Sequence, residues 1–389
     1  MATLPPDFTL LQVIPELETG GAEQTTLDVA QAVVAAGGRA LVASRGGRMA
    51  ARLAEVGGEL IPLPMQSKNP LVMAANAGRL ARLIRRRGVS LVHARSRAPA
   101  FSALRAARAT DVPFVATYHG VYRARTPLKR RWNAIMTAGD LVIANSEFTR
   151  DHLIAEHGVD PARVVTIVRG IDLQRFDPER VSRERIKAVC DLWGLEADDP
   201  GPKLLLAGRL TRWKGQALII EAVARMADTG GPNLMILLAG DDQGRVRYRA
   251  ELEGAIAGMG LSDAVRLVGH TDDMPAAYRL ADLALAPSLE PEAFGRTAVE
   301  PQAMGRAVLA ADHGAARETV VHDETGWLVK PEDIDAWSGA LKRAVEAGPE
   351  RWDALGRAGR DRVRRLYSVE TMTAATLEAY ARVLAQRRD

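Results

Sequence analysis

The chain has 389 residues, which exceeds the length of one ordinary hydrophobic core and predicts two domains or slightly more. Hydrophobic residues make up 47% of the chain and charged residues 26%, and the net charge is +4, a balance typical of globular proteins. The sequence has one cysteine, Cys190, which excludes a disulfide framework and favours a reducing compartment. The first twenty residues do not resemble a secretory signal peptide and no apolar run reaches the roughly 18 residues that span a bilayer, so we expect a cytoplasmic protein that does not cross a membrane.

The first half of the sequence alternates short apolar runs with longer amphipathic segments. Residues 9–15 (TLLQVIP) lead through a glycine-containing loop to a helical pattern over residues 22–38. Further short apolar runs follow, with helix-like stretches rich in Ala, Leu and Arg between them, at residues 40–44, 91–95, 114–119 and 141–146. This spacing predicts a parallel sheet with helices on both faces.

The pattern breaks near residue 170 and then starts again. Turn residues at 169–178, a helical pattern at 183–195 and a polar connector at 196–202 separate the two halves. The alternation resumes with strand-like runs at residues 203–210, 234–240, 265–270, 283–288, 307–311 and 326–329. We therefore predict an α/β protein with two Rossmann-like domains. Its predicted parts are residues 1–175, residues 176–370, and a helix over residues 371–389 that packs back on the N-terminal domain.

The strongest candidate site is the segment over residues 287–305, where an apolar strand leads into a loop and a helix. Glu292 lies in the loop, the helix is predicted to begin near Phe294 and Gly295, and Glu300 lies on it. Along a helix the two glutamates would be roughly 12 Å apart, beyond the roughly 5 to 9.5 Å between the carboxyl groups of a glycosidase. The pair suits a grip on two ends of one extended ligand, while the helix amides would face an oxyanion or a sugar oxygen. Two surface glutamates on a solvated helix are the alternative, which the strand–Pro–Ser–loop context disfavours.

A second candidate site follows the strand-like run KLLLAG. Arg209 and Lys214 lie in a short polar loop after Gly208 and before the next helix. Two cations at the carboxyl end of a parallel strand, beside a helix N-terminus, suit a diphosphate. Surface charge between two elements explains the same residues equally well.

Three weaker candidates lie in the first half. Gly20 and Gly21 let the backbone approach an anion at the start of the first helix, although paired glycines are more often a tight turn and the GxGxxG fingerprint is absent. His119 follows the strand FVAT, where a histidine is well placed for an active site but is more often a hydrogen-bonded loop residue. Asn145 and Ser146 end the following strand and fit either a site or an N-cap.

Together these motifs resemble the family-4 retaining glycosyltransferases, which have the GT-B fold of two Rossmann-like domains facing each other across a cleft. The resemblance covers essentially the whole chain, through GGAE, TYHG, ANSEFTRDHL, GIDLQRFDP, GRLTRWKG and EAFGRTAVEPQAMG in that order. The two glutamates and the GRL…KG loop are its most specific elements. The resemblance is to bacterial lipopolysaccharide and glycolipid transferases, and it implies transfer of a hexose-type sugar from a nucleotide diphosphate sugar with retention of anomeric configuration.

The resemblance places the donor in the second domain. Glu292 would contact hydroxyls of the donor sugar, Glu300 would contact the nucleotide ribose, and Arg209 and Lys214 would hold the diphosphate. These cations would stabilise the leaving diphosphate without a metal ion, and no Asp-x-Asp pattern is placed to hold Mg²⁺, so we expect no cofactor besides the nucleotide sugar. The catalytic candidates are His119, Glu292, Arg209 and Lys214. The donor-binding candidates are Gly20, Gly21, Arg209, Lys214, Glu292, Phe294, Gly295 and Glu300.

The first domain would supply the remaining groups. Gly21 would approach the diphosphate, His119 would lie near the sugar, and Asn145, Ser146 and Arg169 are weaker candidates on the acceptor side. Many relatives have Asn before the Gly-Ile-Asp motif, where this sequence has Arg169. This departure leaves the donor chemistry intact and puts the acceptor side in question.

A basic block precedes these residues. Residues 79–131 contain 14 Arg or Lys and one acidic residue, Asp111. A solvated face enriched in Arg by a composition bias, a nucleic-acid site and an anionic membrane surface all fit such a block. The mixed apolar and basic residues at 127–139 suit a helix lying at a membrane interface, so we expect a lipid-linked or lipopolysaccharide acceptor presented at the inner leaflet. Alternatives are another GT-B enzyme, such as an epimerase or phosphorylase, and a nucleic-acid-binding protein, although no aromatic-interleaved platform supports the latter.

Overall fold

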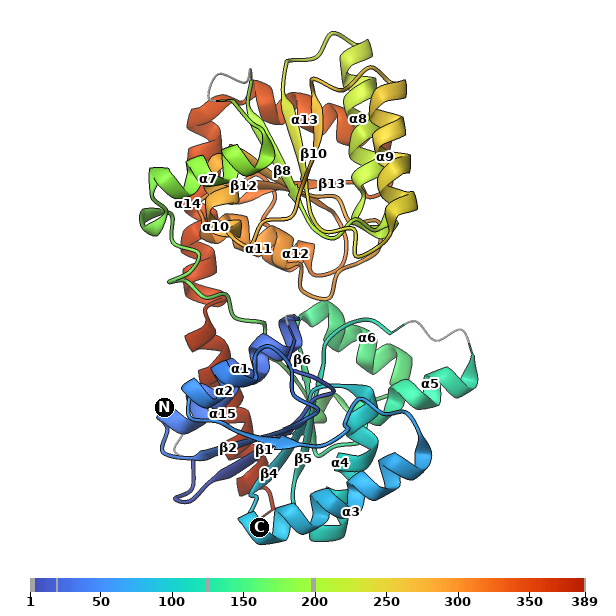
Figure 1. Ribbon diagram of the computed structural model, residues 1–389, viewed down its shortest axis with the longest axis vertical. Coiled ribbons are helices and arrows are strands. Elements are labelled where there is room, and N and C mark those ends of the chain that lie inside the picture. Colours follow the sequence, from blue (N-terminus) through green and yellow to red (C-terminus); the bar gives the residue numbers. More distant parts are fainter. Residues whose placement is uncertain (1–3, 19, 123–125, 197–200, 388–389) are drawn as a thin grey trace. The chain divides into compact units, whose positions relative to one another are not determined.

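The structure is a computed structural model that describes residues 4–18, 20–122, 126–196 and 201–387. The chain divides into two compact units. Unit 1 consists of Met1–Gly170 together with Val369–Asp389, and unit 2 consists of Ile171–Ser368. Each unit is a parallel β-sheet with helices packed on it (Figure 1), which confirms the predicted fold class of two Rossmann-like α/β domains.

Unit 1 contains a seven-stranded parallel sheet in the order β3-β2-β1-β4-β5-β6-β7. The apolar runs identified in the sequence form its central strands, because each run is buried on both faces of the sheet. Its strands are β1 (Thr9–Val13), β2 (Arg39–Ser44), β3 (Glu59–Pro62), β4 (Leu91–Ala94), β5 (Phe114–Tyr118), β6 (Leu141–Ala144) and β7 (Val164–Thr166). The strand order reverses direction between β1 and β4, which pair side by side.

Some helices of unit 1 begin at a residue whose side chain caps the helix. Asn69 accepts a hydrogen bond from the amide of Leu71 at the start of α3, and Ser146 accepts one from the amide of Thr149 at the start of α6. The helices are α1 (Gly21–Ala35), α2 (Ala50–Glu55), α3 (Pro70–Arg87), α4 (Arg97–Thr110), α5 (Pro127–Asn133), α6 (Glu147–His157) and α15 (Val369–Ala385), with 3-10 turns η1 (Ala134–Thr137) and η2 (Pro161–Arg163).

Two hydrophobic layers cover the two faces of this sheet. Alternate strand residues such as Leu11 and Val92 pack with α3 and α4, whereas their neighbours Leu10 and Leu91 pack with α1 and α15. Figure 1 shows α15, in red, against the sheet on the side of α1. The last helix of the described chain therefore completes the core of the unit that the N-terminal segment begins.

Unit 2 repeats the same topology with a six-stranded parallel sheet in the order β10-β9-β8-β11-β12-β13. Its strands are β8 (Lys203–Ala207), β9 (Met235–Ala239), β10 (Val265–Gly269), β11 (Leu283–Ala286), β12 (Ala307–Ala311) and β13 (Gly326–Val329). Its helices are α7 (Arg183–Trp193), α8 (Gln216–Asp228), α9 (Val246–Gly258), α10 (Met274–Leu280), α11 (Arg296–Ala303), α12 (Ala316–Thr319), α13 (Ile334–Glu346) and α14 (Gly348–Leu366), with 3-10 turns η3 (Pro178–Arg180) and η4 (Arg212–Lys214). The fully buried Trp337 of α13 packs with α8 and α9 on one face, while α11 and α12 lie on the other.

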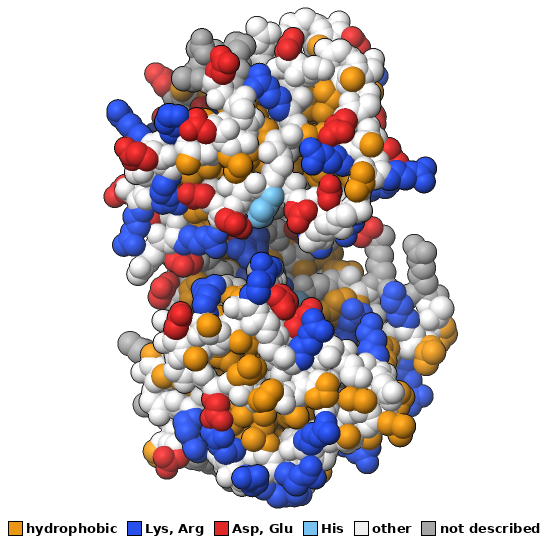
Figure 2. Space-filling model, viewed as in Figure 1, with side chains coloured by type: hydrophobic (Ala, Val, Ile, Leu, Met, Phe, Trp, Pro, Cys, Tyr) orange, Lys and Arg blue, Asp and Glu red, His pale blue; other side chains and the backbone are white. Residues whose placement is uncertain are grey.

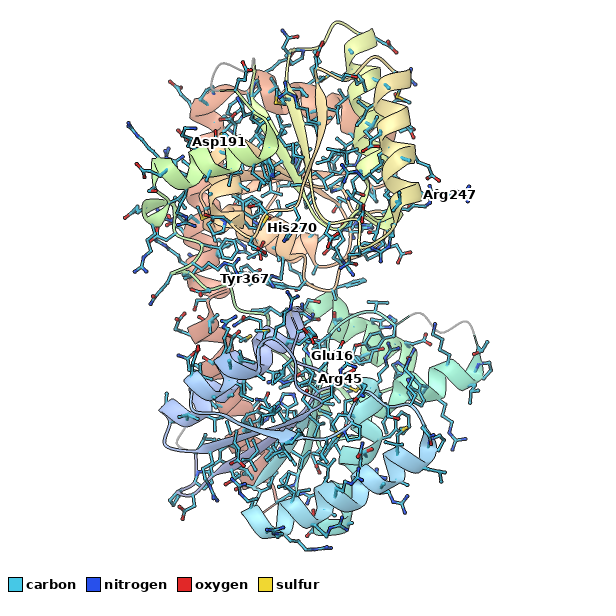
Figure 3. All side chains as sticks on the ribbon, in the orientation of Figure 1. Glu16, Arg45, Asp191, Arg247, His270 and Tyr367 are labelled. Atoms are coloured by element: carbon cyan, nitrogen blue, oxygen red, sulfur yellow. The ribbon has the colours of Figure 1, made fainter. Side chains whose placement is uncertain are left out.

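The chain passes between the units at two adjacent points. Ile171 and Ser368 form a parallel β-bridge, and the amide of Ile171 donates to the carbonyl oxygen of Tyr367 at 2.7 Å. Tyr367, labelled in Figure 3, ends α14. These backbone contacts tie the first residues after Gly170 to unit 2, so the observed division lies a few residues before the predicted boundaries at 175 and 370.

No helix in the described ranges is long and apolar enough to span a bilayer.

Candidate active site

In each unit the strand order changes direction once, and this is where open parallel sheets bind ligands. The change lies between β1 and β4 in unit 1 and between β8 and β11 in unit 2. Arg209 and Lys214 follow β8, and Glu292 follows β11. The predicted donor residues of unit 2 therefore meet at its switch point although the two segments are far apart in sequence.

The loops after β8 and β11 touch through backbone atoms. Gly215 has a φ of +81°, and a Cβ added there would lie 2.1 Å from the carbonyl oxygen of Pro287. The amide of Leu289 also donates to the carbonyl oxygen of Trp213 at 2.7 Å. A side chain at position 215 would force the two loops apart, so glycine is required by both the backbone angle and the close approach.

Lys214 and Glu292 form a nearly buried ion pair at this junction. The Nζ of Lys214 donates to Oε1 of Glu292 at 2.7 Å, and the two side chains are 10% and 18% exposed. The hydroxyl of Ser288 donates to the same carboxylate oxygen. The ammonium also lies 4.5 Å from the ring centroid of Trp213. Both charged groups are therefore fixed in one geometry before any ligand arrives.

Glu300 is held by two neighbours on one side of the switch point. Arg296, one helical turn earlier on α11, donates to Oε1 of Glu300 from Nε at 2.8 Å and from Nη2 at 2.6 Å. The hydroxyl of Tyr278 donates to Oε2 at 3.4 Å, and burial, followed by the nearby Glu300 charge, raises the pKa of Tyr278 well above its usual value. The sequence interpretation missed Arg296 as a partner, although its spacing of four residues from Glu300 was the available signal.

The remaining predicted residues of unit 2 differ in exposure. The helix α11 begins at Arg296 with Gly295 as its N-cap at φ +81°, close to the predicted start. The Phe294 ring is buried and packs at 5.8 Å from the ring of Tyr367, so this side chain belongs to the core. Arg209 is exposed, and no hydrogen bond or ion pair of its guanidinium is found among the residues that the structure describes.

His119 lies at the carboxyl end of β5 and contacts two other predicted residues. The Nη2 of Arg169 lies 3.2 Å from Nδ1 of His119, and Nδ2 of Asn145 donates to the carbonyl oxygen of His119 at 3.4 Å. Within the described ranges, Nε2 of His119 and Oδ1 of Asn145 are buried without a hydrogen-bond partner. Burial, followed by the charges of Arg169 and Arg95, lowers the pKa of His119 well below its usual value. Two buried polar atoms without partners mark a place for a polar ligand.

The other three predicted positions of unit 1, Gly20, Gly21 and Ser146, are at helix starts. Ser146 is buried and is the N-cap of α6, which is the second of the two roles that the sequence allowed for this residue. Gly20 is the N-cap of α1, and a Cβ there would lie 2.2 Å from the Glu23 carboxylate, which covers the helix start. In the loop between β1 and α1, Glu16 pairs with Arg45 at 2.8 Å (Figure 3). An anion at Gly20 and Gly21 would therefore have to displace a carboxylate.

A buried polar network beside His119 escaped the sequence interpretation. Nε and Nη2 of Arg95 donate to Oε1 of Gln12 at 2.9 and 2.6 Å, and Nδ1 of His93 lies 2.6 Å from the hydroxyl of Tyr380 on α15. Thr117 joins the two parts, because its hydroxyl lies 2.7 Å from Nε2 of His93 and 3.4 Å from Nη1 of Arg95. The signal in the sequence was a histidine and an arginine in the otherwise apolar run LVHAR.

Two pairs of adjacent aspartates, Asp241-Asp242 and Asp272-Asp273, include members with local partners. Asp273 caps α10 by accepting from the amide of Ala276 and is paired with Arg185 at 2.6 Å, while Asp242 accepts from the amide of Gly244. Across the described residues, no three His, Cys, Asp or Glu side chains are grouped so that they could hold a metal ion.

Comparison with known proteins identifies the family. The model of Glycosyltransferase Family 4 matches residues 19–175, and that of Glycosyl transferases group 1 matches residues 192–362. The D-inositol 3-phosphate glycosyltransferase of Salinispora tropica is 30% identical over 260 residues, which are 65% of this chain and 53% of that protein. The chain thus spans little more than half the length of the curated relatives it matches.

Solved structures resemble the chain over almost its full length. A glycosyltransferase from Rickettsia africae is 31% identical with a TM-score of 0.89, and the match covers 97% of this chain and 99% of that one. HepE from Anabaena, solved in complex with UDP-glucose, has the same fold at 23% identity and a TM-score of 0.79, covering 95% of this chain and 99% of that one. Because both family models match and the similarity to the Rickettsia protein extends over nearly the full length of both chains, the chain belongs to the family-4 glycosyltransferases of GT-B fold.

Proposed function

We propose that this protein transfers a hexose-type sugar from a nucleotide diphosphate sugar to a hydroxyl group, with retention of anomeric configuration. The observation that carries the proposal is the pair of fixed carboxylates at the switch point of unit 2, one bound to Lys214 and one to Arg296. The family resemblance would assign sugar contacts to the carboxylate on the loop after β11 and ribose contacts to the one on α11.

The electrostatics of the site favour a leaving diphosphate. Lys214 has three donors and uses one on Glu292, so the others are available to phosphate oxygens. Arg209 lies exposed in the same loop and would complete the clamp. Fixed cations near developing negative charge lower the barrier because they need no reorganisation. In this proposal the clamp supplies the charge stabilisation without a metal ion.

The state of Glu292 supports retention without a covalent enzyme intermediate. Its Oε1 already accepts hydrogen bonds from Lys214 and Ser288, which lowers its reactivity as a nucleophile. Such a carboxylate is better suited to accept hydrogen bonds from sugar hydroxyls. The acceptor hydroxyl would then attack on the face from which the diphosphate leaves.

For the acceptor, a basic face on unit 1 favours a lipid-linked or lipopolysaccharide molecule at an anionic membrane surface. Figure 2 shows Lys and Arg side chains over the part of unit 1 where Figure 1 draws α3. The exposed residues of α3 and α5 include Leu71 and Leu128, each 80% exposed, together with Arg82, Arg86 and Arg131. Basic and apolar side chains together suit peripheral attachment to anionic lipid. The second candidate acceptor is an inositol phosphate, which the name of the curated relatives favours.

The donor assignment is tested with purified protein and a panel of UDP- and GDP-sugars. We expect one donor to raise the melting temperature and to release its diphosphate slowly by hydrolysis. A Glu292→Gln variant should lose turnover, whereas Glu324→Gln, a matched change at an exposed glutamate of unit 2, should retain it. If no nucleotide sugar binds to the wild type, the proposed activity is wrong.

The acceptor assignment is tested with that donor and two classes of acceptor, glycolipid in anionic vesicles and soluble inositol phosphate. Transfer to one class names the acceptor, and a donor converted without any transfer would point to an epimerase instead. Vesicle binding in low salt should weaken when Arg82, Arg86 and Arg131 are changed to Gln. It should persist when the same change is made at three exposed arginines of unit 2, Arg247, Arg351 and Arg357. Absence of binding to anionic vesicles would remove the membrane part of the proposal.

A further inference from the structure

Arg169 occupies a position that the donor chemistry does not explain. It is the penultimate residue before the chain leaves unit 1, and its guanidinium contacts the imidazole of His119, 50 positions earlier in sequence. The contact joins Nη2 of Arg169 to Nδ1 of His119 at 3.2 Å. Both residues belong to unit 1, so this geometry is internal to one compact unit.

The chemistry of the two groups decides where the proton lies. A guanidinium has hydrogen-bond donors and no acceptor, and it stays charged in proteins. Nδ1 of His119 must therefore accept the hydrogen bond from Arg169. A neutral imidazole carries one proton, so that proton is on Nε2, the atom that is buried without a partner in the described part of the chain.

The surroundings of the ring oppose a second proton. Burial lowers the pKa of His119 well below its usual value, and the positive charges of Arg169 and Arg95 act in the same direction. An imidazolium would also direct an N–H at the Arg169 guanidinium. The ring is therefore neutral near pH 7, with a single N–H.

We propose that Arg169 is a positioning residue that fixes His119 in the Nε2–H tautomer, so that this ring donates a hydrogen bond to a substrate oxygen. The proposal rests on the proposed function for the nature of that oxygen, which would be a hydroxyl of the sugar. It assigns His119 the role of a donor and excludes Nε2 as a proton acceptor. Arg169 acts through His119 and need not touch substrate.

Asn145 adds a second requirement at the same place. Its Nδ2 donates to the carbonyl oxygen of His119, and its Oδ1 is buried without a partner among the described residues. A hydroxyl group both accepts and donates hydrogen bonds. A sugar hydroxyl can therefore satisfy either orphan atom, by accepting from Nε2 of His119 or by donating to Oδ1 of Asn145.

The tautomer is tested directly by ¹⁵N NMR of the histidine side chains in the full chain without ligand. His119→Gln assigns the resonances of His119. We expect the wild type to show a protonated Nε2 and an unprotonated Nδ1 at pH 7. Arg169→Met should produce a mixture of tautomers, and Arg169→Lys, which keeps a donor, should restore the wild-type pattern. A protonated Nδ1 in the wild type, or an unchanged tautomer in Arg169→Met, would overturn the proposal.

The rate at which the donor is hydrolysed distinguishes a positioning role of Arg169 from a purely structural role. Arg169→Met should reduce the hydrolysis rate at saturating donor by roughly 2- to 160-fold, the range expected for two coupled residues, with Arg169→Lys recovering most of the loss. In the His119→Gln background the same change should have little further effect. Independent, multiplying losses would contradict the proposal. If the wild type binds no nucleotide sugar but shows the expected tautomer, the proposed function is wrong. The tautomer of His119 would then be confirmed, but a sugar hydroxyl would not be its ligand.

Discussion

The contact between α15 and the sheet of unit 1 gives a sharp test of how this unit is completed. Tyr380 is fully buried, and its hydroxyl lies 2.6 Å from Nδ1 of His93, 287 positions away in sequence. Tyr380→Phe keeps the ring, which packs at 5.6 Å from the imidazole, and removes the hydroxyl alone. The variant therefore leaves Nδ1 of His93 buried without a partner.

The expected cost follows from that orphaned atom. Leaving one buried donor or acceptor unsatisfied costs about 1 to 3 kcal/mol, and we expect about 2 kcal/mol because the pair is short and fully enclosed. For a cooperative unit of this size, each kcal/mol corresponds to roughly 2 to 4 °C in melting temperature. The transition of unit 1 should therefore fall by about 4 to 8 °C.

Scanning calorimetry with amide hydrogen exchange measures this effect and locates it. Exchange should accelerate in α15 and in β4, and unit 2 should be unaffected. Tyr248→Phe is the control, because the Tyr248 hydroxyl contacts Gln216 at 3.5 Å within unit 2 and its loss should leave the transition of unit 1 unchanged. A Tyr380→Phe variant as stable as the wild type would refute the view that this hydrogen bond holds α15 in place.

Three further predictions concern the glycine contact, the buried ion pair and pH. Gly215→Ala should destabilise unit 2 by more than Gly230→Ala does. Both glycines have a positive φ, but only at position 215 would the new Cβ lie within 4 Å of a backbone atom. Equal losses of unfolding free energy in urea would contradict this prediction. Glu292→Ala should lower the free energy of unfolding by about 3 kcal/mol, because it leaves the Lys214 charge buried without its partner. The double variant Glu292→Ala/Lys214→Met should lose less stability than the sum of the losses in the two single variants. Additive losses would refute the coupling. Burial lowers the pKa of His93 well below its value near 6.5 in the unfolded chain, so below about pH 6.5 the unfolded state binds more protons than the folded state. The free energy of unfolding should therefore fall by up to about 1.4 kcal/mol for each pH unit below that value. Urea midpoints that stay constant from pH 7.5 to pH 5 would contradict this prediction.

The fold was predictable from the sequence because its signals are local. Each central strand is a short apolar run buried on both faces, and the helices between them begin at caps such as Asn69 and Ser146. The alternation of such runs with helices leaves few topologies other than a parallel sheet. The position of the unit boundary was less predictable, since it depends on the bridge between Ile171 and Ser368.

The contacts of the candidate site could not be predicted in the same way. The ion pair of Lys214 and Glu292 joins positions 78 residues apart, and its short distance depends on how β8 and β11 lie side by side in the sheet. The contact of Arg169 with His119 is likewise set by tertiary packing. Sequence motifs indicated which residues to examine, whereas the partner of each charged group, and hence its protonation or pairing, required the three-dimensional arrangement. The functional roles given to these residues stay predictions until donors are tested.

The discontinuous composition of unit 1 has a consequence for protein synthesis. Because α15 supplies Met372, Ala379, Tyr380 and Val383 to a core that β1 and α1 begin, the ribosome must make all of unit 2 before unit 1 can close. At about 5 to 20 residues per second, the roughly 200 intervening residues take about 10 to 40 s. During that interval the face of the nascent sheet that α1 and α15 share lacks α15, and the apolar residues that α15 would cover are available to chaperones. Unit 1 therefore reaches its native state only after unit 2 has been synthesised.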